Sequence, residues 1–158
     1  MLPLLLPSLL LFCAGFAQPQ GGQGARLLTA DGLGPVRIGA SVEEAARALG
    51  APLRPRSADQ SSRCWITGRA DGRAPGIAYL VAEGRIRRID VFGAPEPESR
   101  ALRVASAAGV GIGTQEAAAL RAYGGRLRVL PHPYTGADGG HYLVLDAADG
   151  KAGVVFET

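Results

Sequence analysis

A stretch of fifteen residues occurs twice in this chain of 158, and the repeat limits the possible folds more than any other feature. Residues 36–50 align without gaps with residues 110–124, and seven of the fifteen positions are identical. A second match, at an offset of 77 residues, relates residues 64–81 to residues 141–158. Each copy of a repeat usually folds as one supersecondary unit that packs against the next copy. The sequence therefore predicts two similar units in tandem.

Each unit is expected to begin with a short helix. In the first unit, Ser41 precedes residues 42–49, in which hydrophobic side chains recur three and four positions apart. Glu44 lies three residues after Ser41, which is the spacing of a capping box. Gly50 then suits the left-handed backbone conformation with which many helices end. These signals predict a helix over 42–49.

Short hydrophobic runs follow the helix and predict an antiparallel sheet. They cover residues 64–69, 76–82 and 85–92, and Glu83-Gly84 is expected to form a tight turn between the last two runs. The helix should pack on one face of this sheet and leave the other face partly open. The predicted fold class is therefore α+β, with two tandem modules, each a short helix packed on a small antiparallel β-meander.

The second unit departs from the first in three ways. Thr114 is placed to cap its helix one position earlier in the alignment, and a strand-like run follows at residues 126–130. The sequence stops at Thr158, so the run at 85–92 has no counterpart. Either the protein is truncated relative to its kin, or residues 153–158 form an exposed sheet edge with unpaired N–H and C=O groups.

The amino-terminal segment is typical of a signal peptide. Residues 1–16 are almost wholly apolar, and the small residues that end at Ala17 predict cleavage after Ala17. The run is too short for a transmembrane helix, which needs about 20 apolar residues. A lipoprotein signal would use Cys13, but Phe12 stands where such signals have a small residue. We therefore expect a periplasmic or secreted protein with no stable membrane anchor after cleavage.

The predicted organisation has five parts. Residues 1–17 form the signal peptide, and residues 18–33 form a flexible leader that is rich in Gly and Gln. The first helix-meander module covers residues 34–93, a linker covers 94–108, and the second module covers 109–158 with its last strand missing.

Signal cleavage would leave Cys64 as the single cysteine of the exported chain. An unpaired thiol in an oxidising compartment indicates an intermolecular disulfide, a buried inert side chain, or a second cysteine outside this sequence. A further hypothesis is that Cys64 is a catalytic nucleophile, which would need a neighbouring base to activate the thiol. No motif places a His or Asn beside Cys64. The pattern favours a structural role.

The composition excludes several classes of protein. Hydrophobic residues make up 47% of the chain and the net charge is +3, which excludes intrinsic disorder, and the length excludes a large multidomain enzyme. The basic residues are sixteen Arg and one Lys. In a chain so rich in Ala and Gly, that bias is explained better by codon usage than by phosphate binding. We therefore expect no nucleic-acid partner.

A longer pattern in the first unit resembles a known family. The residues that carry the resemblance are Ile38-Gly39-x-Ser41-x-x-Glu44, Leu49-Gly50-x-Pro52, Trp65 in the first run, and Tyr79-Leu80-Val81-x-Glu83-Gly84-Arg85-Ile86. Over residues 34–92, and more weakly over 109–158, the chain resembles the helix-then-meander module of the outer-membrane assembly lipoprotein family BamE (SmpA/OmlA). Two such modules in tandem resemble the β-lactamase inhibitory proteins. The resemblance implies a periplasmic or secreted protein that binds proteins and catalyses no reaction.

The search for catalytic chemistry is mostly negative. Both histidines lie in segment 131–142, where His132, His141 and Asp138 offer the ligand types that suit zinc. Their spacing matches no established zinc signature, and His141 aligns with Cys64 in a strand position. No phosphate-binding loop, nucleophile elbow or carboxylate pair occurs. We predict no catalytic residue, cofactor or metal, and keep as the alternative hypothesis a small periplasmic metal-dependent hydrolase that uses this segment.

Aromatic and Arg side chains, which are enriched at protein interface hot spots, are expected on the open sheet faces. The candidate partner-binding residues are Trp65, Arg63, Arg69, Arg87, Tyr134 and Tyr142. A second interpretation places Trp65 and Tyr79 in the core. The sequence thus predicts an exported, non-enzymatic protein-binding module whose partner is another exported or envelope protein.

Overall fold

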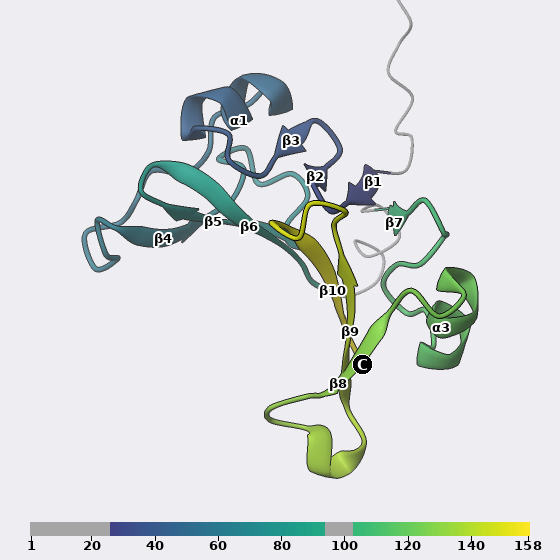
Figure 1. Ribbon diagram of the computed structural model, residues 1–158. Helices are drawn as coiled ribbons and strands as arrows, with labels where there is room; N and C mark the ends of the chain where they lie inside the picture. Colours follow the sequence, from purple (N-terminus) through teal and green to yellow (C-terminus); the bar gives the residue numbers. More distant parts are fainter. Residues whose placement is uncertain (1–25, 94–102) are drawn as a thin grey trace, which may run out of the picture.

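The computed structural model describes residues 26–93 and 103–158, which fold into three small sheets, two α-helices and one short 3-10 helix (Figure 1). The strand orders are β4-β5-β6, β10-β9-β8 and β3-β2-β1-β7. Strands outnumber helices in this part of the chain, and the predicted α+β class is confirmed. The predicted signal peptide with its cleavage site at Ala17 lies outside the described residues.

The first sheet is antiparallel and consists of β4 (Cys64–Thr67), β5 (Ile77–Ala82) and β6 (Arg85–Val91). Every second side chain of β5 is buried, because successive side chains of a strand point to opposite faces. The buried face packs against α1 (Val42–Leu49) and forms the first hydrophobic core. The expected turn at Glu83-Gly84 is present, with φ of 52° and 72° at its two residues.

The predicted capping box of α1 is confirmed. The Ser41 hydroxyl accepts a hydrogen bond from the Glu44 N–H, and the Glu44 carboxylate accepts one from the Ser41 N–H at 2.7 Å. Gly50 ends the helix in the left-handed conformation with φ of 62°. Local sequence signals alone therefore set both ends of this helix.

We predict that Ser41→Ala lowers the free energy of unfolding by about 1 kcal/mol, because the first turn of α1 loses a side-chain hydrogen-bond acceptor. Gln115 occupies the N-cap of the second helix without a side-chain hydrogen bond. It is the matched control, and Gln115→Ala should change the stability by less than about 0.5 kcal/mol. Urea unfolding followed by circular dichroism measures both. Equal losses in the two variants would show that the Ser41 cap contributes nothing.

The second sheet consists of β8 (Arg128–Pro131), β9 (His141–Asp146) and β10 (Gly153–Glu157), and β9 lies between the other two. The second helix, α3 (Glu116–Tyr123), packs on one face of this sheet. Ala119 and Tyr123 of that helix meet Leu143 of β9 in a second hydrophobic core, which is separate from the first. The 3-10 helix η1 (Gly136–Asp138) lies in the connection from β8 to β9.

The prediction that Thr114 caps the second helix is wrong. The N-cap residue is Gln115, and the Thr114 hydroxyl instead accepts a hydrogen bond from the Gly111 N–H at 3.1 Å. Thr114 therefore stabilises the turn before the helix. Thr114 is the residue before the N-cap, so its hydroxyl lies closer to the N–H groups of the preceding turn than to those of the first helical turn.

The predicted leader and linker both contain strands. Residues 26–33 were expected to belong to a leader, but they form β1 (Arg26–Thr29) and β2 (Gly32–Leu33). β2 pairs with β3 (Val36–Arg37), and β1 pairs in parallel with β7 (Val104–Ser106), which lies in the expected linker. Leu33 is buried in the first core, which is the physical reason for the order of this segment. Residues 18–25 and 94–102 lie outside the described residues.

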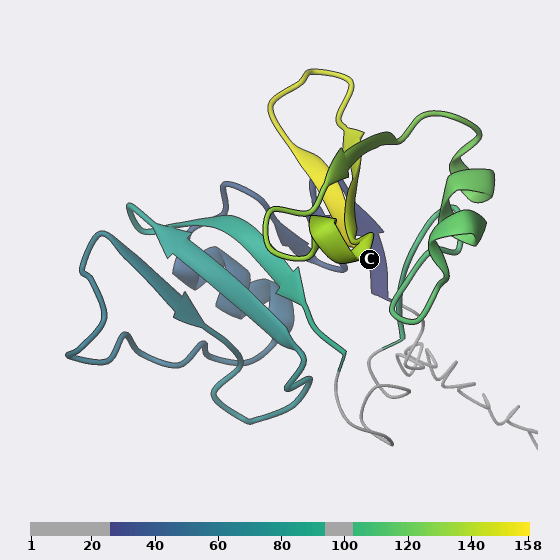
Figure 2. The same cartoon turned by 90° about the horizontal axis from the view of Figure 1, so that it is seen from below.

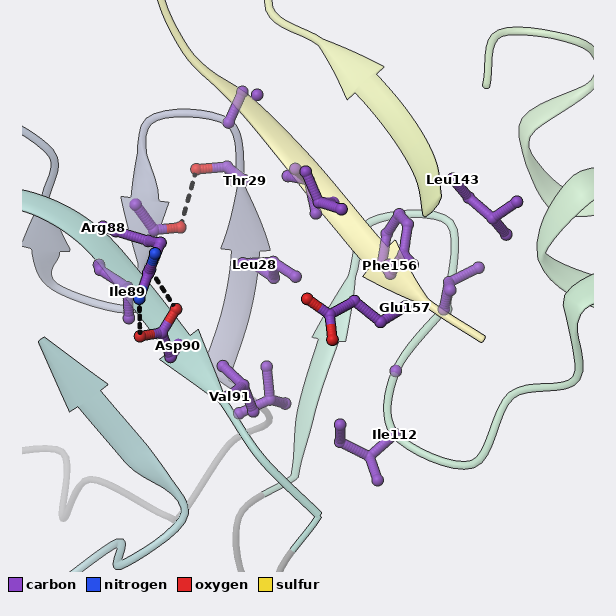
Figure 3. Close-up of a pocket in the computed structure, with 18 of the residues that line it drawn as sticks. Leu28, Thr29, Arg88, Ile89, Asp90, Val91, Ile112, Leu143, Phe156 and Glu157 are labelled. Atoms are coloured by element: carbon purple, nitrogen blue, oxygen red, sulfur yellow. Dashed lines mark hydrogen bonds and ion pairs between the residues drawn. The ribbon is translucent and has the colours of Figure 1, made fainter. Parts of the chain in front are cut away.

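The first and second sheets lie side by side, with an edge strand of each on the side toward the other. Figures 1 and 3 show β6 of the first sheet next to β10 of the second, and the two strands run in roughly the same direction. From below, α1 covers the first sheet while α3 stands at the other end of the molecule (Figure 2).

Neither helix is long and apolar enough to cross a membrane, a finding that concerns only the described part.

Candidate partner-binding groove

A cavity of about 520 Å³ lies between β6 and β10 (Figure 3). We call it the edge groove and define its two walls as residues 87–92 and residues 153–158. Residues 28–29 of β1 and the turn at 110–114 also line it. The groove therefore collects segments from both ends of the described chain, and no local stretch of sequence contains it.

The backbone of β10 is paired on one side only within the described residues. The Thr158 N–H donates to the His141 carbonyl, and the Ala147 N–H donates to the Ala152 carbonyl. Backbone groups of alternate residues point to opposite sides of an antiparallel strand. The N–H and C=O groups of Gly153, Val155 and Glu157 consequently point away from β9 and toward the groove.

β6 presents a second open edge to the same groove. The Phe92 N–H donates to the Gly76 carbonyl, so the alternation directs the N–H and C=O groups of Ile89 and Val91 away from β5. Near its start, β6 is covered, because the Ile86 N–H donates to the Ala40 carbonyl at 2.8 Å. The open part of this edge therefore begins after the β-bulge that follows Ile86.

The groove is lined largely by apolar side chains. Leu28 and Val91 lie at one side and Phe156 at the other, and Ile112 closes the lower end in Figure 3. Ile112 is 57% exposed and Val155 is 52% exposed, although hydrophobic side chains of this size are usually buried. Two open strand edges thus enclose hydrophobic surface that the described residues leave partly accessible to solvent.

Charged side chains stand along the rim of the groove. Arg88 forms an ion pair with Asp90 at 2.7 Å on the β6 side. Glu157 extends from β10, and its carboxylate lies 3.9 Å from the His132 ring nitrogen Nε2. Its side chain is 68% exposed, so a partner could reach the carboxylate from solution.

The six residues predicted to bind a partner do not form one cluster. Arg87 lines the groove from β6 and makes an exposed ion pair with Glu83 at 3.5 Å. Trp65 lies directly opposite Val81 on the core face of the first sheet and packs against that core, as the second interpretation expected. Arg63 is exposed just before β4, and its carbonyl accepts the Glu83 N–H at 3.0 Å.

Arg69 connects the first sheet to its helix. Its guanidinium donates to the Leu49 carbonyl at 2.9 Å and to Asp71 at 3.0 Å, and only 14% of the side chain is exposed. The hydrogen bond from Arg69 lowers the pKa of Asp71 from 3.8 to about 2. These contacts give Arg69 a structural role at the end of α1.

The Asp71 carboxylate should make the stability of the protein depend on pH. A carboxyl group with a lowered pKa stabilises the fold above its unfolded pKa, and this contribution is lost as the pH falls through the folded value. We predict that wild type melts at a higher temperature than Asp71→Asn at pH 6, and that the difference disappears between about pH 4 and pH 2. Calorimetry across that range measures it. A difference that persists at pH 2 would contradict this assignment.

Tyr134 and Tyr142 lie together against His132 in the second sheet. The Tyr142 ring meets the His132 ring edge-on at 4.5 Å, and the Tyr134 ring lies at 5.9 Å from the same imidazole. Tyr134 is 88% exposed, whereas Tyr142 is partly buried. Tyr142 faces Glu157 across the strand pair, so this aromatic cluster borders β10 without lining the groove.

The two histidines of the alternative metal site each have other contacts. His132 Nδ1 accepts hydrogen bonds from the N–H groups of Tyr134 and Thr135. His141 Nδ1 lies 3.0 Å from the Glu116 carboxylate, and this contact lowers the pKa of Glu116. Within residues 26–93 and 103–158, no three His, Cys, Asp or Glu side chains are grouped closely enough to hold a metal ion.

Cys64 is exposed at the start of the edge strand β4 and forms no disulfide within the described part of the chain. The interpretation as a buried inert thiol is therefore wrong. The outward position follows from the alternation of the strand, because the neighbouring Trp65 occupies the core face.

No protein-family model, curated protein or solved structure matches the chain. The groove must therefore be interpreted from its own residues. Arg87 is one of the residues predicted from the sequence, and an exposed edge at residues 153–158 is one of the two alternatives stated there. Leu28, Ile112 and Phe156 were not predicted as lining residues. The signal in the sequence was the alignment of residues 153–158 with residues 76–81, because the strand β5 in that segment pairs with β6 as well as with β4.

Proposed function

We propose that the chain is an exported, non-enzymatic protein-binding protein, built from two tandem helix-and-sheet modules, whose partner binds in the edge groove. The apolar segment 1–17 supports export to the periplasm or the extracellular space. The resemblance to the BamE (SmpA/OmlA) family and to the β-lactamase inhibitory proteins rests on the sequence pattern and supports the same class of function.

Matching details in the two halves support the tandem modules. α1 and α3 each have eight residues, and their bounds differ by the 74 residues that separate the two repeats. Gly39 and Gly113, which precede the helices, have φ of 87° and 81°, and the C-cap residues Gly50 and Gly124 have φ of 62° and 56°. Two separate cores, each with one helix and one three-stranded sheet, fit the same interpretation.

The observation that carries the proposed binding role is the pair of open strand edges on opposite walls of one apolar cavity. Exposed edges are sites at which another chain can add a strand, and proteins usually cover or charge them to prevent such pairing. In the described residues, Val155 of β10 and Ile112 both line the cavity, and each is more than half exposed. Apolar surface beside unpaired backbone groups is typical of strand-binding sites.

Site-specific photocrosslinking in cells that naturally produce the protein tests this function. The crosslinker p-benzoyl-phenylalanine replaces Val155 in the groove and, as a matched control, Leu130 on β8, which is 41% exposed at the other edge of the same sheet. We expect Val155 to crosslink to one envelope or secreted protein and Leu130 not to do so. Equal crosslinking at the two positions, or none at Val155, would contradict a partner site in the groove.

A further inference from the structure

We infer that the edge groove binds one extended strand of a partner protein, antiparallel to β10, with a side-chain pattern like that of β6. This inference rests on the proposed function and specifies the partner's chemistry. The bound strand would lie between β6 and β10 and join the two sheets through backbone hydrogen bonds.

The repeat identifies the kind of strand that fits. In the alignment, β10 corresponds to β5 and β9 corresponds to β4. β5 pairs with β4 on one side and with β6 on the other, whereas β10 pairs with β9 and has no second partner among the described strands. The side of β10 that faces the groove is therefore the side on which the first sheet carries β6.

The backbone geometry suits a strand that is antiparallel to both walls. The alternation of each strand directs the N–H and C=O groups of Val155 and Glu157 away from β9, and those of Ile89 and Val91 away from β5. All four residues line the cavity. Since β6 and β10 run in roughly the same direction, a strand antiparallel to one is antiparallel to the other. Main-chain hydrogen bonds on both sides would supply affinity, and the side-chain pattern would supply specificity.

The register of β6 on β5 predicts the contacts. In the first sheet, Ile89 lies opposite Tyr79, Val91 opposite Ile77 and Arg88 opposite Leu80. At the repeat offset, the partner residues that take those positions would lie opposite Phe156, Val154 and Glu157 respectively.

Two consequences follow from this register. Two apolar partner side chains would point to the side of the sheet that holds Leu28 and Ile112, which line the groove. An Arg on the other face would lie opposite Glu157, and an opposite-charge pair across two strands is stabilising. In the described structure, the Glu157 carboxylate lies 3.9 Å from the His132 ring nitrogen Nε2.

The direct test uses a peptide with the sequence of residues 83–92, acetylated at its amino end, amidated at its carboxyl end and labelled with fluorescein. Fluorescence anisotropy measures its binding to the purified chain. We expect one peptide to bind each chain with a dissociation constant of about 10 µM. A peptide in which serine replaces the three residues corresponding to Ile86, Ile89 and Val91 should bind at least about tenfold more weakly, because it buries less apolar surface.

Val155→Pro distinguishes a loss of backbone pairing with the peptide from a loss of folding. The Val155 N–H points away from β9, so Val155→Pro removes a donor from the groove without removing a hydrogen bond from the sheet, and proline is tolerated at such edge positions. We expect Val155→Pro to weaken peptide binding at least about tenfold, and Val155→Thr, which keeps the N–H, to change it less than about threefold. The melting temperature confirms that both variants are folded.

A charge exchange tests the register. Glu157→Arg should weaken binding of the peptide by roughly fivefold, because the residue that corresponds to Arg88 would then face a like charge. A second peptide that carries Glu at the position of Arg88 should bind this variant as the first peptide binds wild type. Rescue by the exchanged peptide would place these two side chains opposite each other. Without rescue, the proposed register is wrong.

The outcomes distinguish this inference from the proposed function. If Val155 crosslinks to a partner protein but the peptide neither binds nor competes, the groove binds a partner by some means other than a β6-like strand. Equal binding of the peptide to wild type and Val155→Pro also overturns the inference. A dimer in sedimentation velocity that Val155→Pro converts to a monomer would assign the groove to a second copy of this chain and overturn it as well.

Discussion

Leu143→Ala is expected to lower the free energy of unfolding by about 3 kcal/mol, the largest effect of any substitution considered for this protein. Leu143 is fully buried on the central strand β9, where it meets Val110, Ala119 and Tyr123. Removal of its side chain leaves a cavity in a core with few buried residues, so neighbouring side chains can fill little of the space. Urea unfolding followed by circular dichroism measures the loss.

Val129 provides the matched control for Leu143. It lies directly opposite Leu143 in the sheet but is 45% exposed. Val129→Ala should therefore cost less than about 1 kcal/mol. If Leu143→Ala cost no more than this control, the second core would not hold α3 against its sheet as described.

An appended strand is expected to raise the melting temperature by roughly 5 to 10 °C. The fusion places a copy of residues 82–92 directly after Thr158, which reproduces the order β5, turn, β6 of the first sheet. A short tether holds the strand near the groove at a concentration on the order of 1 mM. For a strand that binds at about 10 µM, this concentration stabilises the folded state by about 2.7 kcal/mol.

The control for the fusion is the same appended segment with serine in place of its apolar residues at positions corresponding to Ile86, Ile89 and Val91. This fusion should melt at the wild-type temperature, and only the first fusion should prevent the free peptide from binding. An unchanged melting temperature in the first fusion, together with unimpaired peptide binding, would show that the groove does not accept a β6-like strand.

The sequence predicted well those features that depend on near neighbours. The capping box of Ser41 and Glu44, the left-handed Gly50 and the turn at Glu83-Gly84 each depend on a few consecutive residues. The runs predicted at residues 76–82 and 85–92 form β5 and β6, because two hydrophobic runs joined by a tight turn are a local signal for paired strands.

The features that the sequence did not predict depend on contacts between distant residues. β1 looked like part of a leader because its order comes from parallel pairing with β7, as in the Leu28–Ser106 register pair. Such a pairing has no local signature in a strand of four residues. Arg69 looked like a surface cation, but the Leu49 carbonyl and Asp71 occupy its guanidinium.

The candidate site was foreseen only in outline for the same reason. The repeat offered an exposed edge at residues 153–158 as one of two alternatives, the other being truncation relative to kin, and in the described residues β10 pairs with β9 alone. The repeat could not show that a second open edge, from β6, stands on the other wall. That arrangement depends on how the two sheets lie relative to each other, which neither copy of the repeat encodes alone.

Amide hydrogen exchange at Val155 and Phe156 tests the central claim most directly, namely that the backbone of β10 is open toward the groove. Measured by NMR in the free protein, the outward Val155 amide should exchange rapidly, and the Phe156 amide, which points to β9, should be protected. Addition of the peptide with the sequence of residues 83–92 should slow exchange at Val155 at least about tenfold. Equal protection of Val155 and Phe156 in the free protein would contradict the account, because the edge would already be paired.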